Sequence, residues 1–427
     1  MNSRLLMLLI ALMSFVGTQF GQAKKESLQD LTTEAIKVSP KVKMLQSKFN
    51  AAKSNIEIGT NLPDPVLTLG LVNLPTNTFS FTQEPMTGKI IGISQAIPFP
   101  GALSSAADVK SVDTSIVKQE IFDLRNEICK DVSDLYYSLQ YIREDIRLSE
   151  ESIELLNQIS NVAKRKFEVG NASLQNIIQV EVQITRVKDK IETLRGKEKS
   201  VTAKLNAMLL RSENAPIITE EISPIDSYNL NSDTLLKIAE LNRPLLQKIK
   251  FGELKARLMK KQAEYSFYPN FKVGVQYSQR DYSSKTGLDF TDFFSVVVGV
   301  TLPINYGGKK SEKVNSAIYL QSLYDNKYKS VLQDLQSSFG GINGKISELE
   351  KRETLFTKSL LPQAEQSYKA SIADYQVGKI DFVNVIKAEN DILNIKTKLA
   401  KIRVDYSKSI SQLEYLSGKQ LKIKGYK

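Results

Sequence analysis

Histidine is absent from the sequence, and cysteine occurs once, at Cys129. Histidine is the commonest general base and the commonest zinc or copper ligand, so its absence argues against acid–base catalysis and histidine metal sites. A single internal cysteine excludes a disulfide within the chain, a thiol-rich metal site and a lipidated N-terminal cysteine. No phosphate-binding loop or nucleophile motif is present either. We therefore predict neither enzymatic activity nor a cofactor.

Long apolar runs are missing after the first 23 residues. Residues 1–23 combine a basic start, an apolar run from Leu5 to Val16 and small residues before Lys24, which is typical of a secretory signal peptide. The alternative is a retained N-terminal anchor, but the run is shorter than the roughly 20 residues that a membrane helix needs. No later stretch reaches that length. If the mature chain enters a membrane, we expect it to do so as a closed β-barrel.

Positive charge is in excess but is not clustered. The formal net charge is +11, from 58 Lys and Arg against 47 Asp and Glu. The cations are scattered among the acidic residues, which indicates solvated helix faces rather than a phosphate-binding stripe. We therefore predict no nucleic-acid partner.

The two halves of the chain repeat one another. Matched residues share their type and their order: Leu31, Ala35, Pro40 and Gly170 in the first half, and Leu235, Ala239, Pro244 and Gly378 in the second. The first three pairs are 204 positions apart and the last pair is 208 apart, as small insertions would cause. The repeat is far longer than a solenoid unit, which indicates tandem duplication of a half-molecule.

Each half predicts the same order of elements: a first helix, a β-hairpin and a long helical hairpin. The first helices are expected over 31–59 and 233–266. The predicted segments are the signal peptide 1–23, the first repeat 24–210, the linker 211–233, the second repeat 234–417 and the basic tail 418–427. In the first repeat the β-hairpin is expected over 65–97 and the helical hairpin over 103–210. In the second repeat they are expected over 270–302 and 308–417.

Apolar residues at steps of three and four predict coiled-coil packing in the long helices. They run from Ile121 to Ile146 and, in the same phase, from Tyr328 to Leu349. A continuous helix over 103–167 would be about 100 Å long at 1.5 Å per residue. That length fits a helical tube or rod and not a globular domain.

Three features predict where the long helices turn or bend. Gly170 and Gly378 should end the first helix of each hairpin in the left-handed conformation. Ser173 and Asp381 should then cap the second helix. Pro362 predicts either a bend or a loop, and we favour a bend because the helical pattern continues on both sides.

Alternating apolar and polar residues predict four strands. The alternating segments lie at 66–71, 91–94, 271–278 and 294–302. A half-buried sheet of a soluble protein would show the same alternation, but a secretion signal and tube-length helices favour strands that cross a bilayer. Four strands cannot close a membrane barrel, because the smallest have about eight. The chain should therefore oligomerise, and these patterns allow a dimer of eight strands or a trimer of twelve.

This architecture resembles the TolC family of outer-membrane efflux channels over about residues 30–420. The most specific marks are the Ala-x4-Pro openings and the turn Tyr375-x2-Gly378, followed by Asp381, Val385 and Ala388-Glu389, with a weaker copy at Phe167. The resemblance implies a mostly α fold with a membrane β-barrel portion. It also implies a homotrimer in outer-membrane lipid, with a twelve-stranded barrel and a helical tunnel that extends into the periplasm. The implied partners are a periplasmic adaptor and an inner-membrane pump of the RND type.

Three further segments resemble the branch that serves cobalt-zinc-cadmium and copper-silver exporters: Pro63-Asp-Pro65, Glu84-Pro-Met86 and Pro98-Phe-Pro100-Gly101. Ala102 stands where members often have lysine. The expected function is passive conduction of heavy-metal cations from pump and adaptor to the exterior. The alternatives are a TolC-like channel for drugs or other organic compounds or for type I secretion, and a periplasmic coiled-coil adaptor. A structural coiled-coil protein would leave the strands without a purpose.

The resemblance places the functional residues at the hairpin tips. Those expected to dock on the adaptor are Val169, Gly170, Asn171, Val377, Gly378 and Lys379, and those expected at the periplasmic entrance or gate are Asn176, Tyr375, Asp381, Asn384 and Lys387. The family's closing tyrosine survives as Tyr375, but Ile380 stands at the arginine position, and Asn384 and Lys387 stand at the two aspartate positions. Asn176 and Asn384 are equivalent in the repeat and would form a neutral ring of six in a trimer. Solvated hairpin asparagines are the alternative.

Overall fold

The computed structural model describes residues 25–227 and 231–421. The predicted signal peptide and most of the basic tail lie outside these residues. The chain divides into two compact units. The first contains Met1–Val42, Leu124–Ile238 and Gln336–Lys427, and the second contains Lys43–Asp123 and Ala239–Leu335. Among the described residues, none of the helices combines the length and apolar character needed to cross a membrane.

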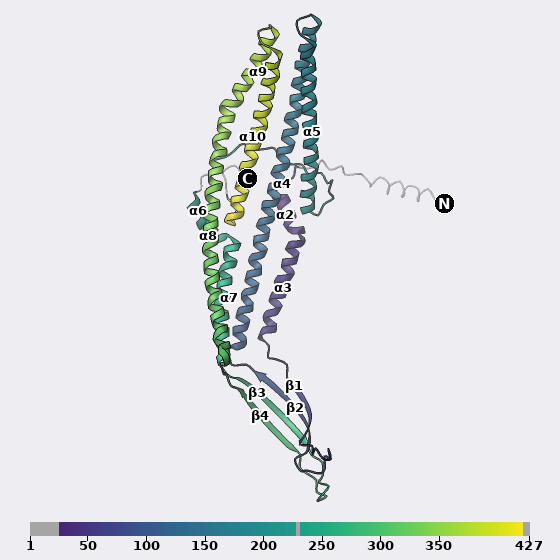
Figure 1. The fold of residues 1–427 in the computed structure, drawn as a ribbon, viewed down its shortest axis with the longest axis vertical. Coiled ribbons are helices and arrows are strands. Elements are labelled where there is room, and N and C mark those ends of the chain that lie inside the picture. The colour runs from purple at the N-terminus through teal and green to yellow at the C-terminus, as the bar shows by residue number, and fades with distance from the viewer. Residues whose placement is uncertain (1–24, 228–230, 422–427) are drawn as a thin grey trace, which may run out of the picture. The chain divides into compact units, whose positions relative to one another are not determined.

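The elements follow the predicted order in both repeats (Figure 1). In the first repeat they are α2 Leu28–Val38, α3 Pro40–Thr60, β1 Val66–Val72, β2 Gly88–Ile97, α4 Ala102–Glu168 and α5 Leu174–Met208. In the second they are α6 Ser232–Asn242, α7 Pro244–Glu264, η1 Tyr265–Phe267, β3 Asn270–Gln279, β4 Phe293–Thr301, η2 Tyr306–Gly308, α8 Lys309–Leu355, η3 Phe356–Leu360, α9 Leu361–Gln376 and α10 Phe382–Ser417. The fold class expected from the sequence, mostly α with four strands per chain, is confirmed.

The first helix of each repeat is broken in two, and the predictions of single helices over 31–59 and 233–266 were wrong in this respect. α2 ends at Val38 and α3 begins at Pro40, while α6 ends at Asn242 and α7 begins at Pro244. Proline lacks the N–H that a helix interior needs, and it disfavours the helical conformation of the residue before it. Each proline therefore starts a new helix at its first position, where no N–H is missed.

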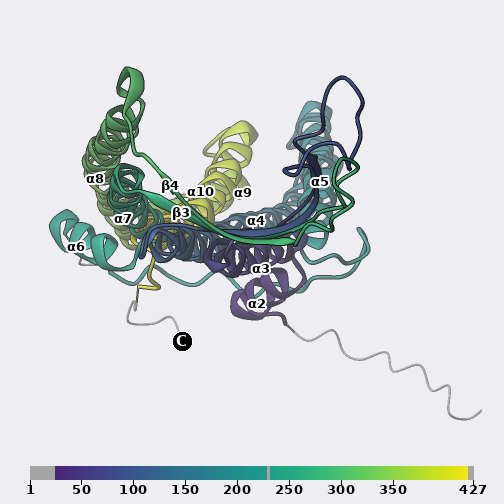
Figure 2. The ribbon, with the colours of Figure 1, turned by 90° about the horizontal axis from the view of Figure 1, so that it is seen from below.

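The four strands form one antiparallel sheet in the second unit, in the order β1-β2-β3-β4. The sheet is curved (Figure 2). The two β-hairpins, one from each repeat, join through β2 and β3, where Ile93 lies opposite Val275. Side chains on one face of β1 and β4, including Leu67, Leu69 and Val296, are large, apolar and exposed. β1 and β4 are the two edge strands. The sheet thus has an uncovered apolar face and two open edges in a single chain.

The longest element is α4, a single helix of 67 residues. The residues predicted to form its apolar stripe are buried at Ile121, Ile128, Val132, Leu139 and Ile142. In α8 the corresponding stripe buries Leu335, Phe339, Ile346 and Leu349. The steps of three and four therefore identified the packed faces of both helices.

The second long helix continues through Pro362 without a loop. α8 leads into the π-helical segment η3, and α9 follows directly from Leu361. A π-helical turn shifts the hydrogen-bonding pattern by one residue, which is a known way for a helix to accommodate an interior irregularity. The alternative of a loop at Pro362 is therefore wrong, and the bend favoured from the sequence stays a prediction.

The linker after α5 packs on α4 through hydrogen bonds to its backbone. Arg143 Nη1 donates to the carbonyl oxygen of Ile217 at 2.7 Å, and Gln140 Nε2 donates to that of Glu220 at 2.8 Å. The hydroxyl of Tyr136 accepts a hydrogen bond from the backbone N–H of Glu220 at 3.0 Å. Tyr136 lies in a buried apolar cluster with Leu31, Ala35, Val132 and Leu205. These contacts fasten α2, α4, α5 and the linker into one core.

Both helical hairpins turn at a glycine. Gly170 has φ +77° and Gly378 has φ +78°. The backbone N–H of Asn171 bonds to the carbonyl oxygen of Lys166, and that of Lys379 bonds to that of Asp374, each at 2.8 Å. This is the six-to-one hydrogen bond of a Schellman motif. The predicted left-handed ends are confirmed.

We expect Gly378→Ala and Gly340→Ala to change stability in opposite directions. An alanine at the positive φ of residue 378 should cost about 1 kcal/mol. Gly340 lies inside α8, where an added Cβ meets nothing within 4 Å, so alanine there should stabilise by about 0.5–1 kcal/mol. Thermal unfolding of the purified protein measures both. Equal effects from the two substitutions would contradict the role given to the turn.

Candidate functional site at the helical hairpin tips

The two tips in the first unit are exposed and chemically similar. Val169 precedes the turn between α4 and α5, Val377 precedes the turn between α9 and α10, and each is 68% exposed. The glycine and the polar residue that follow each valine are exposed as well. An exposed valine beside a glycine leaves a small apolar surface with open backbone. All six residues predicted to contact an adaptor are therefore accessible in the single chain.

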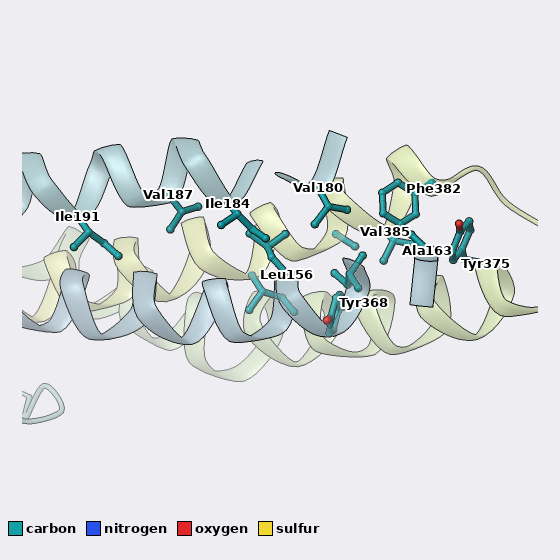
Figure 3. Close-up of a cluster of buried hydrophobic side chains, with 13 residues drawn as sticks. Leu156, Ala163, Val180, Ile184, Val187, Ile191, Tyr368, Tyr375, Phe382 and Val385 are labelled. Atoms are coloured by element: carbon teal, nitrogen blue, oxygen red, sulfur yellow. The ribbon is translucent and has the colours of Figure 1, made fainter. Parts of the chain in front are cut away.

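Tyr375 is the centre of the contacts just behind the tips. Its side chain is only 6% exposed, and its ring lies 5.0 Å from that of Phe382, the first residue of α10. Asn176 in α5 donates a hydrogen bond from Nδ2 to the tyrosine hydroxyl at 3.3 Å. Figure 3 shows Tyr375 beside Phe382 and Val385 at the end of the buried cluster. The structure thus brings together two of the predicted gate residues, Asn176 and Tyr375.

Lys166 in α4 adds a third contact that the sequence reasoning missed. Its ammonium nitrogen lies 4.6 Å from the centre of the Tyr375 ring and donates to the carbonyl oxygen of Tyr375 at 2.5 Å. The sequence contains one weak indication that Lys166 lies near Tyr375: Lys166 directly precedes Phe167, the repeat counterpart of Tyr375. We call Lys166, Asn176, Tyr375 and Phe382 the tip tie, since they join α4, α5, α9 and α10.

The remaining predicted gate residues lie outside the tip tie. Asp381, Asn384 and Lys387 are exposed on the first turns of α10. Ser173 and Asp381 are N-cap residues as predicted, but within the described chain neither side chain makes the expected capping hydrogen bond. The predicted positions of the N-caps are therefore confirmed, but the predicted side-chain hydrogen bonds are not.

Asn176 and Asn384 have different environments despite their equivalent places in the repeat. Asn176 is half-buried and bonds to Tyr375, whereas Asn384 is exposed. Phe167, the counterpart of Tyr375, has no hydroxyl that Asn384 could bond. The two asparagines therefore have different surroundings in the single chain, and the ring of six stays a prediction.

A buried apolar cluster supports the tip tie from below (Figure 3). Its members come from α4, α5, α9 and α10: Leu156, Ile159, Ala163, Val180, Ile184, Val187, Ile191, Tyr368, Tyr375, Phe382, Val385, Ala388 and Ile392. Because the members of this cluster interdigitate, the position of Tyr375 depends on the packing of all four helices.

Polar contacts cross the helices at intervals along this packing. Gln183 in α5 donates to Asn390 in α10 at 2.6 Å. Lys190 in α5 and Thr397 in α10 both donate to the Oδ1 of Asp145 in α4, at 2.7 and 3.1 Å. Burial, with the nearby Asp145 carboxylate, raises the pKa of Tyr141 to about 12. Partly buried polar contacts of this kind favour one alignment of the residues that face one another across a coiled coil.

The chemistry at the tips is that of contact and charge. No group of three or more cysteine and carboxylate side chains is placed to hold a metal ion within residues 25–227 and 231–421. The tip tie consists of one cation, one amide and two aromatic rings. Such an arrangement can hold helices together and can be separated without breaking a covalent bond.

Comparison with solved structures shows the fold. The outer membrane protein VceC of Vibrio cholerae matches with a TM-score of 0.76 at 15% identity, over 92% of this chain and 97% of that chain. CusC matches with a TM-score of 0.73 at 15% identity, over 92% of each chain. A family model described as outer membrane efflux protein matches residues 235–419. Outer membrane protein TolC of Escherichia coli (strain K12) is 28% identical over 207 residues.

This chain resembles the TolC-type outer-membrane efflux channels.

The resemblance differs in extent between relatives. The TolC match covers 44% of this chain and 41% of that protein, and the match to TolC of Salmonella enteritidis covers 53% of the latter. The chain's matches thus span about half the length of these two relatives. The cobalt-zinc-cadmium resistance protein CzcC of Cupriavidus metallidurans is 18% identical over 303 residues, which are 71% of this chain and 70% of that protein. The name of CzcC supports the resemblance to the heavy-metal branch, and the name of TolC supports the predicted outer-membrane localisation.

The tip tie differs from the closing contacts expected of a TolC-type channel. Ile380, at the expected arginine position, is half-buried and packs against the apolar cluster. The cation beside Tyr375 comes instead from Lys166, on the other hairpin. In the first tip, the amide of Asn176 donates to the tyrosine hydroxyl. The tyrosine is therefore held by a different set of partners.

We expect the hydroxyl of Tyr375 and the amide of Asn176 to be energetically coupled. Tyr375→Phe keeps the ring packing and removes one hydrogen bond, so it should cost about 1 kcal/mol of unfolding free energy. Asn176→Ala should cost a similar amount, and the double variant little more than either single one. Denaturant unfolding of the three variants measures this coupling. Asn384→Ala, at the exposed counterpart, is the control and should change stability by less than about 0.5 kcal/mol.

Proposed function

We propose that the chain is the channel subunit of a tripartite efflux system, and that it conducts substrate passively through the outer membrane. The observation that carries this proposal is the four-stranded sheet, which exposes an apolar face and leaves the outer edges of β1 and β4 unpaired. Unpaired edges are costly in lipid, where no water satisfies the backbone. A homotrimer would pair β4 of one copy with β1 of the next and close a barrel of twelve strands.

The helices support assembly in the same way. α3 has 21 residues and not one of them is buried. One face of α3, which includes Val42, Leu45 and Phe49, is only half-buried, so the helix gains little from packing within its own chain. Contact with neighbouring copies would cover it, and the long helices of three copies would enclose a tunnel in the periplasm. The tips would then lie at the inner end of that tunnel.

The tip tie is the proposed gate. The exposed residues of the two tips, from Val169 to Asn171 and from Val377 to Lys379, would contact a periplasmic adaptor that works with an inner-membrane pump. Docking there would separate the hairpins and break the contacts of Tyr375. Asp381, Asn384 and Lys387 are exposed beside the tie and would line the entrance.

Loss of the tip tie should raise conductance. In planar bilayers the purified protein should form pores of low conductance, because the tie holds the hairpins together. Lys166→Met removes the charge that faces Tyr375, and we expect it, together with Tyr375→Phe, to raise open conductance several-fold. Lys197→Met changes an exposed lysine of α5 outside the tip tie; it is the matched control and should leave the conductance unchanged. A protein that never forms pores would contradict the channel function itself.

For the cargo we propose heavy-metal cations. The support is the likeness to CzcC over 71% of this chain, together with the segment Pro98–Gly101. In the structure this segment forms the corner between β2 and α4. Phe99 stacks on Tyr268 with ring centres 4.5 Å apart, and its backbone N–H bonds to Asn270 Oδ1 at 3.1 Å. The segment therefore acts as a structural joint, and its bearing on metals lies in its likeness to that branch.

Growth of a deletion strain tests the cargo. The strain should become sensitive to zinc, cobalt, cadmium, copper or silver salts, and the intact gene should restore growth. Dyes, bile salts and antibiotics form the comparison set, because the likeness to TolC allows organic compounds as the alternative. Sensitivity to the organic compounds alone would keep the channel and contradict the metal assignment.

A further inference from the structure

Glu389 is a carboxyl group buried in the bundle of α4, α5, α9 and α10. It lies in α10 and is 1% exposed. Its neighbours along α10, Ala388 and Ile392, belong to the buried cluster that supports the tip tie. An ionised carboxylate in such a place loses the water that would stabilise its charge.

The hydrogen bonding of Glu389 is incomplete for an ionised group. Its Oε1 accepts a hydrogen bond from the hydroxyl of Ser152, on the facing side of α4. Its Oε2 is also buried and has no hydrogen-bond partner in the described part of the chain. A carboxylate needs several donors to replace its hydration, whereas a neutral carboxyl group needs fewer. The site as built therefore suits the protonated form.

The charges on the surrounding helices do not offset this preference. On α9, the titratable side chain near Glu389 is Tyr368, whose pKa is raised to about 12 by burial and by the charge of Glu389. The other charges on α4 and α5 include the half-exposed ion pair Lys164–Glu181 and the exposed Arg147 with its glutamate partners. Burial raises the pKa of Glu389 to about 7, and the hydrogen bond from Ser152 opposes that rise.

We propose that Glu389 is a proton-controlled clasp: when protonated it holds α10 against α4, and when ionised it loosens that contact. The proton is exchanged with solvent, and no other bond changes. Glu389 lies two turns of α10 after Phe382, which touches Tyr375 in the tip tie. Loosening of α10 at Glu389 therefore reaches the proposed gate. This regulation rests on the proposed channel function.

The direction of the pH effect follows from the raised pKa. Below about pH 4.5 the carboxyl is protonated whether α10 is packed or not, and the packing is tightest. Between that value and about 7 the exposed form ionises first, so the packed form loses stability as the pH rises. Above about 7 the loss is complete. The hairpins should hence be held most firmly in acid and release most easily in alkali.

Amide hydrogen exchange of the full-length purified protein tests the clasp without requiring transport. Exchange in the segment 382–392 is compared at about pH 5.5 and about pH 8, after correction for the intrinsic rate. The wild-type segment should lose about thirtyfold in protection at the higher pH, because the packed form loses stability over the roughly 1.5 pH units between pH 5.5 and the raised pKa of about 7. Glu389→Gln keeps the shape of a neutral carboxyl, so its protection should stay the same at both pH values.

Two further variants make the test specific. Ser152→Ala removes the hydrogen bond that opposes the rise in pKa, so the midpoint of the transition should move to higher pH. Glu181→Gln alters the repeat counterpart of Glu389, which is half-exposed and paired with Lys164, and should keep the wild-type contrast. The clasp would be disproved if Glu389→Gln kept the wild-type difference in protection between the two pH values. It would also be disproved if Ser152→Ala left the midpoint of the transition at the wild-type pH.

Conductance in planar bilayers separates the clasp from the channel function. Opening of the wild-type protein should increase as the pH rises through the same midpoint, and Glu389→Gln should remove this dependence. A protein that shows the exchange contrast but never conducts would overturn the channel function and leave the clasp. A protein that conducts but shows no difference in exchange between the two pH values would overturn the proposed role of Glu389 and leave the channel function standing.

Discussion

Burial of apolar side chains at steps of three and four along antiparallel helices is the interaction on which the rest of the structure depends. α4 is 67 residues long and has one apolar stripe, which only neighbouring helices can cover. Without α5, α9 and α10 it would be an exposed rod of marginal stability. The contacts of Tyr375 at the tips are available because this packing brings four helices to one place. The packing of the bundle therefore sets the positions of the residues on which any function of the tips depends.

Apolar packing alone would leave the alignment of these helices ambiguous, because a stripe can slide by one repeat of the pattern. The polar contacts remove this ambiguity. Asp145, Lys190 and Thr397 meet at one level of the bundle, and Gln183 meets Asn390 at another. A displaced helix would leave the buried carboxylate of Asp145 without its two donors, at a cost of about 1–3 kcal/mol or more. These contacts thus select one alignment of the helices. The proposed gate at the tips depends on that alignment, because its residues come from different helices.

The two repeats contain two copies of each element, and matched residues in the two copies differ in their burial and contacts. Phe167 is exposed while Tyr375 is buried. Glu181 pairs with Lys164 near the surface, and Glu389 is enclosed by apolar side chains. The sequences around these positions remain similar enough to align. The difference lies in what surrounds them, since the second hairpin carries the tyrosine to which the first hairpin donates its amide and its cation.

The sequence by itself determined the helices, the four strands, the left-handed turns at Gly170 and Gly378, and the buried stripe of α4. These are local properties, because periodicity and backbone preference act over a few residues. The breaks before Pro40 and Pro244 were local too and were missed, although proline chemistry explains them. Only the tertiary structure placed Lys166 against Tyr375 and enclosed Glu389. Ser152 and Glu389 are 237 positions apart, and whether a carboxyl is buried depends on which helices cover it, which no local pattern records.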